Sequence, residues 1–181
     1  MVNFMQKTLI KYVVCVAFGI FWVYGMITLM ALFSLNCAPI ELAAPLSGYV
    51  NAYTSVITFK PQLVGMLIIL NNMLVLMVCL HWTFCPNIPV TGFLIGCLIK
   101  VKGGETASLL LVLSRLYSQP FAVLELGAYV LVISFSLYKR LCRRGTYDET
   151  YEDDESFLSS IVPMIGMCML MVAGMLEAML I

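Results

Sequence analysis

The sequence predicts an all-α fold, a polytopic bundle with about five membrane-spanning helices and one short half-helix or interfacial helix. Hydrophobic residues make up 62% of the 181 residues and charged residues 11%, whereas soluble domains hold about 45 to 50% and about 25%. Several apolar runs are also long enough to cross the ~30 Å hydrocarbon core of a bilayer. We therefore expect residues 1–181 to form a single integral membrane domain.

Composition and motifs exclude several functions. The formal net charge is zero, which removes the electrostatic basis for a nucleic-acid partner. Seven cysteines without a CxxC pair, and one histidine, His81, predict neither a zinc site nor a disulfide framework. The sequence has no HExxH or GxSxG motif. We expect a non-enzymatic protein with no catalytic residue, no cofactor and no metal.

The first predicted span, 12–35, follows Lys7 and Lys11. It is too long for the apolar part of a signal peptide, so we expect an uncleaved helix. A lipoprotein cleavage before Cys37 is disfavoured, because Asn36 is a poor residue before a processed cysteine. Residues 36–62 are mixed in character and predict an interfacial loop, with a short surface helix near 46–57.

The next two predicted spans carry features that favour helix packing. The span 63–80 holds Asn71 and Asn72 near its middle, where amides need partners, and helix association is favoured over a transport site. The span 88–101 contains Gly92 and Gly96. Small residues four apart allow two helix backbones to approach closely.

The segment 107–117 is too short to span by itself, and it carries Arg115. The span 120–138 begins at Pro120, whose missing N–H costs nothing at the first helical position. Glu125 lies near its start. An ionisable side chain in hydrocarbon is a functional-site hypothesis by default.

A hydrophilic loop, 139–156, changes from basic to acidic along its length. We expect it to be cytoplasmic and to dock a partner through Arg140, Arg143, Arg144, Asp153 and Asp154. The last span, 157–181, contains Glu177 and a run of methionines. Flexible packing explains these methionines better than Cu(I) binding, because no histidine or cysteine pair stands beside them to complete a site.

The positive-inside rule places the N-terminus and the basic cluster at 139–144 on the cytoplasmic side of the cell membrane. An even number of crossings must separate them, which four spans supply if 107–117 does not cross. The C-terminus then lies outside. This topology places Glu125, Glu177 and Arg115 in one outer layer, with Asn71 and Asn72 nearer the midplane.

Two interpretations of this polar layer stay open. Glu125 is favoured at a helix start by about 0.3 to 1 kcal/mol through the helix dipole, and pairs with Arg115. Alternatively, Glu125, Glu177 and the two asparagines line a polar cavity that carries an ion, a proton or a small solute.

Four short motifs follow one another in the order seen in a known family. PFAVLEL, at 120–126, resembles the PHGxxEL signature of the stage II sporulation protein M family of integral membrane proteins. LNNMLVL at 70–76, TGFLIG at 91–96 and GMLEA at 174–178 are similar to that family's other motifs, and together they cover about 63–181. Phe121, Ala122 and Thr91 replace the family's His, Gly and Asn, whereas Pro120, Glu125, Gly92, Gly96 and Glu177 match by position.

The resemblance implies a membrane component without enzyme activity. In spore formers such a protein belongs to a complex with cell-wall hydrolases. We therefore expect a scaffold subunit that contacts the lipid bilayer and other membrane proteins, as a homo- or hetero-oligomer, through its small-residue faces and its hydrophilic loop. The alternative is a permease-like transporter or channel component whose loop docks a cytoplasmic ATPase.

Overall fold

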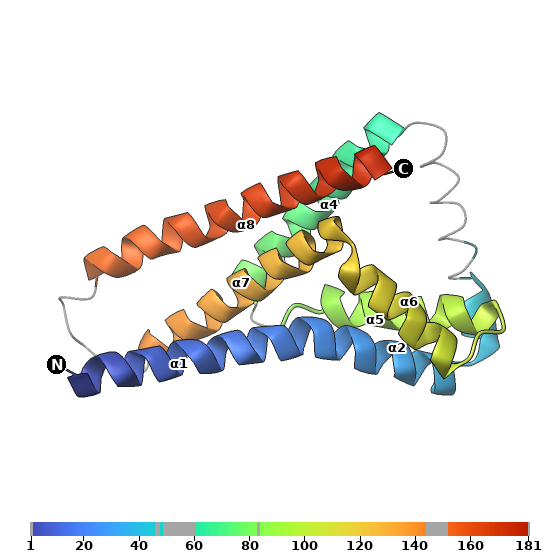
Figure 1. The fold of residues 1–181 in the computed structure, drawn as a ribbon, viewed down its shortest axis with the longest axis horizontal. Coiled ribbons are helices and arrows are strands. Elements are labelled where there is room, and N and C mark those ends of the chain that lie inside the picture. Colours follow the sequence, from blue (N-terminus) through green and yellow to red (C-terminus); the bar gives the residue numbers. More distant parts are fainter. Residues whose placement is uncertain (1, 46–47, 49–60, 83, 144–151, 181) are drawn as a thin grey trace.

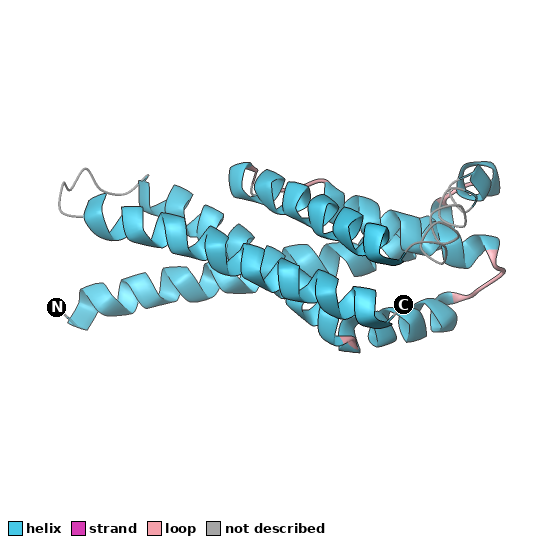
Figure 2. Ribbon diagram, turned by 90° about the horizontal axis from the view of Figure 1, so that it is seen from above, coloured by secondary structure: helices cyan, strands magenta, loops and turns pink. Residues whose placement is uncertain are grey.

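The computed structural model describes residues 2–45, 48, 61–82, 84–143 and 152–180, and all regular structure in these ranges is helical (Figure 2). The elements are α1 (Val2–Ile20), η1 (Phe21–Gly25, a π-helical turn), α2 (Met26–Cys37), α4 (Pro61–His81), α5 (Asn87–Val101), α6 (Thr106–Ser118), α7 (Pro120–Arg143) and α8 (Glu152–Leu180). The all-α prediction is confirmed. The surface helix expected near 46–57 falls almost wholly outside the described residues.

Three helical stretches are long and apolar enough to cross a membrane: Leu9–Cys37, Pro120–Leu141 and Ser160–Glu177. The apolar stretches Ile68–His81, Asn87–Val101 and Thr106–Ser118 are shorter. At about 1.5 Å per residue, α5 and α6 each reach only about 20 Å, short of the hydrocarbon thickness. On length and composition the structure thus supports three spans of the expected five.

α1, η1 and α2 form one continuous rod along the length of the molecule (Figure 1). α5 packs along α2, and the two helices run in the same direction, because Gly92 lies against Ile27 and Gly96 against Ala31. A methyl group on either glycine would collide with the carbonyl of its neighbour. The two glycines predicted to pack helices therefore form a contact within the chain.

α6 returns beside the rod and ends in a sharp break. Gln119 adopts an extended conformation, and α7 begins at Pro120. The Tyr117 hydroxyl at the end of α6 donates to the Tyr24 carbonyl, 3.3 Å away in η1, and lies 3.0 Å from the Thr28 hydroxyl. α5 and α6 thus form a short helical hairpin beside α2, and α7 starts where this hairpin ends (Figure 1).

α7 runs antiparallel to α1, with the rings of Tyr12 and Tyr138 6.0 Å apart. α8 packs against both α7 and α4. The Arg140 guanidinium donates to the His81 carbonyl at 2.5 Å. The first turns of α1 and the last turns of α4 and α7 therefore lie at the same end of the molecule.

The hydrophilic segment is shorter than the loop predicted at 139–156. α7 continues to Arg143 and α8 begins at Glu152, because charged side chains at helix ends reach water without unwinding the backbone. Arg144 lies outside the described residues. The backbone at Arg143, Asp153 and Asp154 is helical, and their side chains are among those not described.

Candidate functional site

Glu125 lies in the second turn of α7, half-buried where α4, α7 and α8 meet. The Tyr129 hydroxyl donates to its carboxylate oxygen Oε1 at 3.3 Å. The Asn72 side chain from α4 is its second hydrogen-bond partner, and Glu177 from α8 lies within electrostatic range. We call Asn72, Glu125, Tyr129 and Glu177 the polar cluster.

Helix geometry explains why these residues meet. Glu125 and Tyr129 are four residues apart, so both project from the same face of α7. That face is the buried one, since Ala122, Leu126 and Tyr129 are each less than 10% exposed. Asn72 is likewise buried on α4. Each helix therefore presents a polar side chain on the stripe that it packs against its neighbours.

The two asparagines expected to act together have different environments. Asn72 is 5% exposed, whereas Asn71 lies on the surface of the chain. Adjacent residues on a helix point about 100° apart, so only one can face the core. Asn71 remains connected through its amide, which donates to the Asn72 side-chain oxygen at 3.4 Å.

Arg115 does not join this cluster. It lies on the exposed side of α6, while Leu109 and Leu113 occupy the buried side. The partners found for Glu125 come from α4, α7 and α8 instead. The extended Gln119 separates the axes of α6 and α7, so residues ten apart in sequence do not share a helix face.

Tyr129 was missed by the sequence analysis. It stands one helical turn after an acid within an apolar span, and this spacing alone predicts that the two side chains meet. What the sequence does not show is that Tyr129 is buried at 4% exposure. Its hydroxyl therefore depends on Glu125 for a partner, because an unpaired buried polar group is costly.

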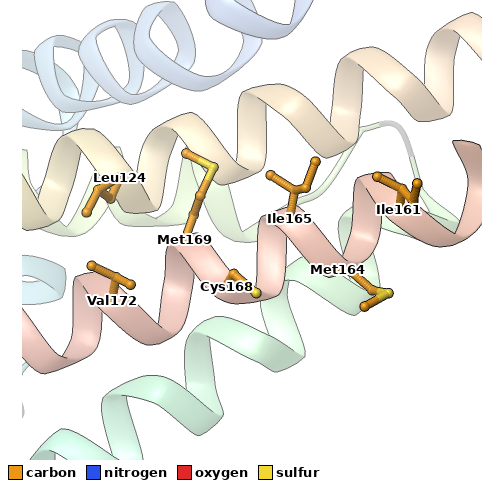
Figure 3. Close-up of a pocket in the computed structure, with 7 residues that line it drawn as sticks. All are labelled: Leu124, Ile161, Met164, Ile165, Cys168, Met169 and Val172. Carbon is orange, nitrogen blue, oxygen red and sulfur yellow. The ribbon is translucent and has the colours of Figure 1, made fainter.

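An open apolar hollow of about 420 Å³ lies between α7 and α8. Figure 3 shows its lining, which is Leu124, Ile161, Met164, Ile165, Cys168, Met169 and Val172. No member of the polar cluster belongs to this lining. The hollow suits acyl chains or apolar side chains rather than ions.

No protein-family model, curated protein or solved structure matches this chain. Its function is therefore inferred from its own residues and their arrangement.

Proposed function

We propose that the chain is a non-enzymatic multi-pass protein of the cell membrane that serves as a structural subunit of a membrane complex. The main support for this proposal is the pair of hydrogen bonds that Glu125 makes. One is to Asn72 of another helix, and the other is to Tyr129. In hydrocarbon such interhelical bonds stabilise association by about 0.6 to 2 kcal/mol. The hydrogen bond between Glu125 and Asn72 thus ties α7 to α4.

The chain crosses the membrane five times in this proposal, with a cytoplasmic N-terminus and an external C-terminus. α5 makes the third crossing and α7 the fourth, while α6 lies on the outer side without crossing. Two contacts support this topology: Arg140 with His81, and Tyr12 with Tyr138. They put the basic end of α7 beside the basic N-terminus, on the side that positive charge prefers.

Single-cysteine labelling tests the topology in a background from which all seven native cysteines have been removed. Labels at residues 102 and 181 are expected to react with an impermeant reagent from outside. A label at residue 145 is expected to react only after the cells are opened. Reaction of residue 145 in intact cells would overturn the five-crossing arrangement.

The surfaces left for partners are not the small-residue faces first expected, because Gly92 and Gly96 already pack against α2. The free faces are apolar, and on α8 they include Met171, Met175 and Met179, each more than 40% exposed. Such faces suit lipid or the helices of another subunit. A homo- or hetero-oligomer would therefore assemble through α8 or through the first helix.

Kinship with the stage II sporulation protein M family is part of this proposal. Four motifs of this chain resemble motifs of that family. Three of them contribute Asn72, Glu125 and Glu177, which come from separate helices and meet in the polar cluster. The remaining motif supplies the close contact of α5 with α2. Matching motifs that converge in space support a common fold better than their order in sequence alone.

Substitution of Glu125 separates the structural function from its alternative, a transporter component. Glu125→Gln keeps the shape and an acceptor oxygen, so we expect it to preserve folding and recovery with partner membrane proteins in mild detergent. Glu125→Ala removes both hydrogen-bond acceptors, and we expect it to impair both. The transporter would be supported by two results together. Liposomes that hold the wild-type chain would pass protons or small cations, and Glu125→Gln would abolish this flux while the chain stays folded.

A further inference from the structure

Two thiols far from any cysteine motif lie together where α4 gives way to α5. Cys79 stands in the last turns of α4, and Cys85 lies in the short link before α5. Both are free and 0% exposed, and their side chains are hydrogen-bond partners. The Cys85 sulfur also lies 4.0 Å from the carbonyl of Val75, one turn before Cys79. We call these two residues the thiol pair.

Several hydrogen-bond donors converge on Cys85. Its partners are the Cys79 side chain and the backbone N–H groups of Asn87 and Ile88. These N–H groups belong to the first turn of α5, where the helix dipole also favours negative charge.

An aromatic cluster begins at the residue next to Cys85. Phe84, next to Cys85, packs edge-on against Trp22 at 5.0 Å and against Phe18 at 5.8 Å. Tyr129 of the polar cluster lies within electrostatic range of both cysteines. Both sulfurs are therefore shielded from water, and the Tyr129 side chain lies nearby.

We propose that Cys79 and Cys85 together bind one Cu(I) ion as a two-coordinate bis-thiolate. The ion takes the place of the proton shared between the two sulfurs. Both thiols end deprotonated, their protons pass to solvent, and the site carries one net negative charge. No redox change is involved.

The available ligands distinguish Cu(I) from zinc. Thiolates select soft ions such as Cu(I) and also bind zinc, but structural zinc requires four ligands. Within the described residues no group of three or more His, Cys, Asp or Glu side chains is placed to hold a metal. His81 lies close in sequence, but its ring bonds the Met77 carbonyl at 2.9 Å on the exposed side of α4. Two sulfurs without further donors fit a monovalent ion of low coordination number.

Titration of the purified full-length chain with Cu(I) tests the site. The chain is kept in mild detergent under anaerobic conditions, and a chromophoric Cu(I) chelator competes for the metal. We expect one Cu(I) per wild-type chain. Cys79→Ser and Cys85→Ser are each expected to weaken binding at least about tenfold, the scale of losing a group at a metal site. Cys168→Ser, at an exposed position on α8, is the matched control and is expected to leave binding unchanged.

X-ray absorption of the wild-type chain loaded with Cu(I) tests the same site without mutation, so the result does not depend on the serine variants folding. Two sulfur scatterers and no nitrogen or oxygen are expected. Failure of the wild-type chain to retain Cu(I) against the chelator would overturn the proposal. So would unchanged affinity in the two serine variants, or loss of binding in Cys168→Ser, which would assign the metal to the surface of α8.

Discussion

The contact between α5 and α2 makes the strongest quantitative prediction. A Cβ at Gly96 would collide with the Ala31 carbonyl and the Ser34 hydroxyl, and the first of these belongs to the backbone. Backbone atoms cannot rotate away, so Gly96→Ala must push two helices apart. Overpacking of this kind costs about 1 to 3 kcal/mol, and alanine recovers up to about 1 kcal/mol through its better helix propensity. Because the collision involves backbone atoms, the cost lies in the upper part of that range, about 2 to 3 kcal/mol, and the net loss is about 1 to 2 kcal/mol.

Thermal unfolding in mild detergent measures this loss, followed by the fluorescence of Trp22 and Trp82. A change of 1 kcal/mol shifts the midpoint by about 2 to 4 °C in chains of this size, so Gly96→Ala should melt roughly 2 to 8 °C lower. Gly127→Ala is the matched control. Its new Cβ would meet only the terminal methyl of Met169 at 3.1 Å, which can move, so its midpoint should stay level or rise.

The comparison between the two glycines decides the outcome. If Gly96→Ala melts at or above the wild-type temperature while Gly127→Ala behaves as expected, α5 does not pack on α2 through this face. The close parallel contact described here would then be wrong.

Substitutions at three further positions test other contacts through the same melting assay. Tyr117→Phe removes the bonds to η1 and to Thr28, and it should cost about 1 kcal/mol, with no change if α6 is not anchored there. Lys100→Met removes the ammonium that donates to the Ala38 carbonyl at the end of α2. We expect the free energy of unfolding to fall by about 1.5 kcal/mol, which is low for a charged donor because the lysine is only partly buried. Gly103 has a φ of +70°, so Gly103→Ala should cost about 1 to 2 kcal/mol of stability and Gly103→Asn less. Equal stability of the wild type and the two variants would contradict a left-handed turn at this position.

The polar residues show how far sequence reasoning reaches. Glu125 stands out because an acid is rare in an apolar span, and its position near a helix start follows from Pro120. Its partners do not follow in the same way. Arg115 is nearer in sequence and opposite in charge, yet the extended Gln119 turns α6 away, and the acid instead contacts Asn72 from a helix about fifty residues earlier.

The thiol pair illustrates a similar limit. Cys79 and Cys85 are six residues apart, a spacing that matches no recognised ligand motif, so the sequence predicts neither a metal site nor a disulfide there. They meet because α4 ends at His81 and the link to α5 folds back against the last turns of α4. The end of a helix and the path of a link depend on tertiary packing.

The sequence by itself determined the helical class, the apolar segments and the position of the α7 start, because hydrophobicity and proline geometry act locally along the chain. Only the tertiary structure decided which helix faces meet. Large apolar side chains lie on the exposed as well as the buried faces of these helices, so hydrophobic periodicity does not single out the buried side. Close contact at Gly92 and Gly96, and hydrogen bonds between distant polar groups, make that choice, and both depend on residues far apart in sequence.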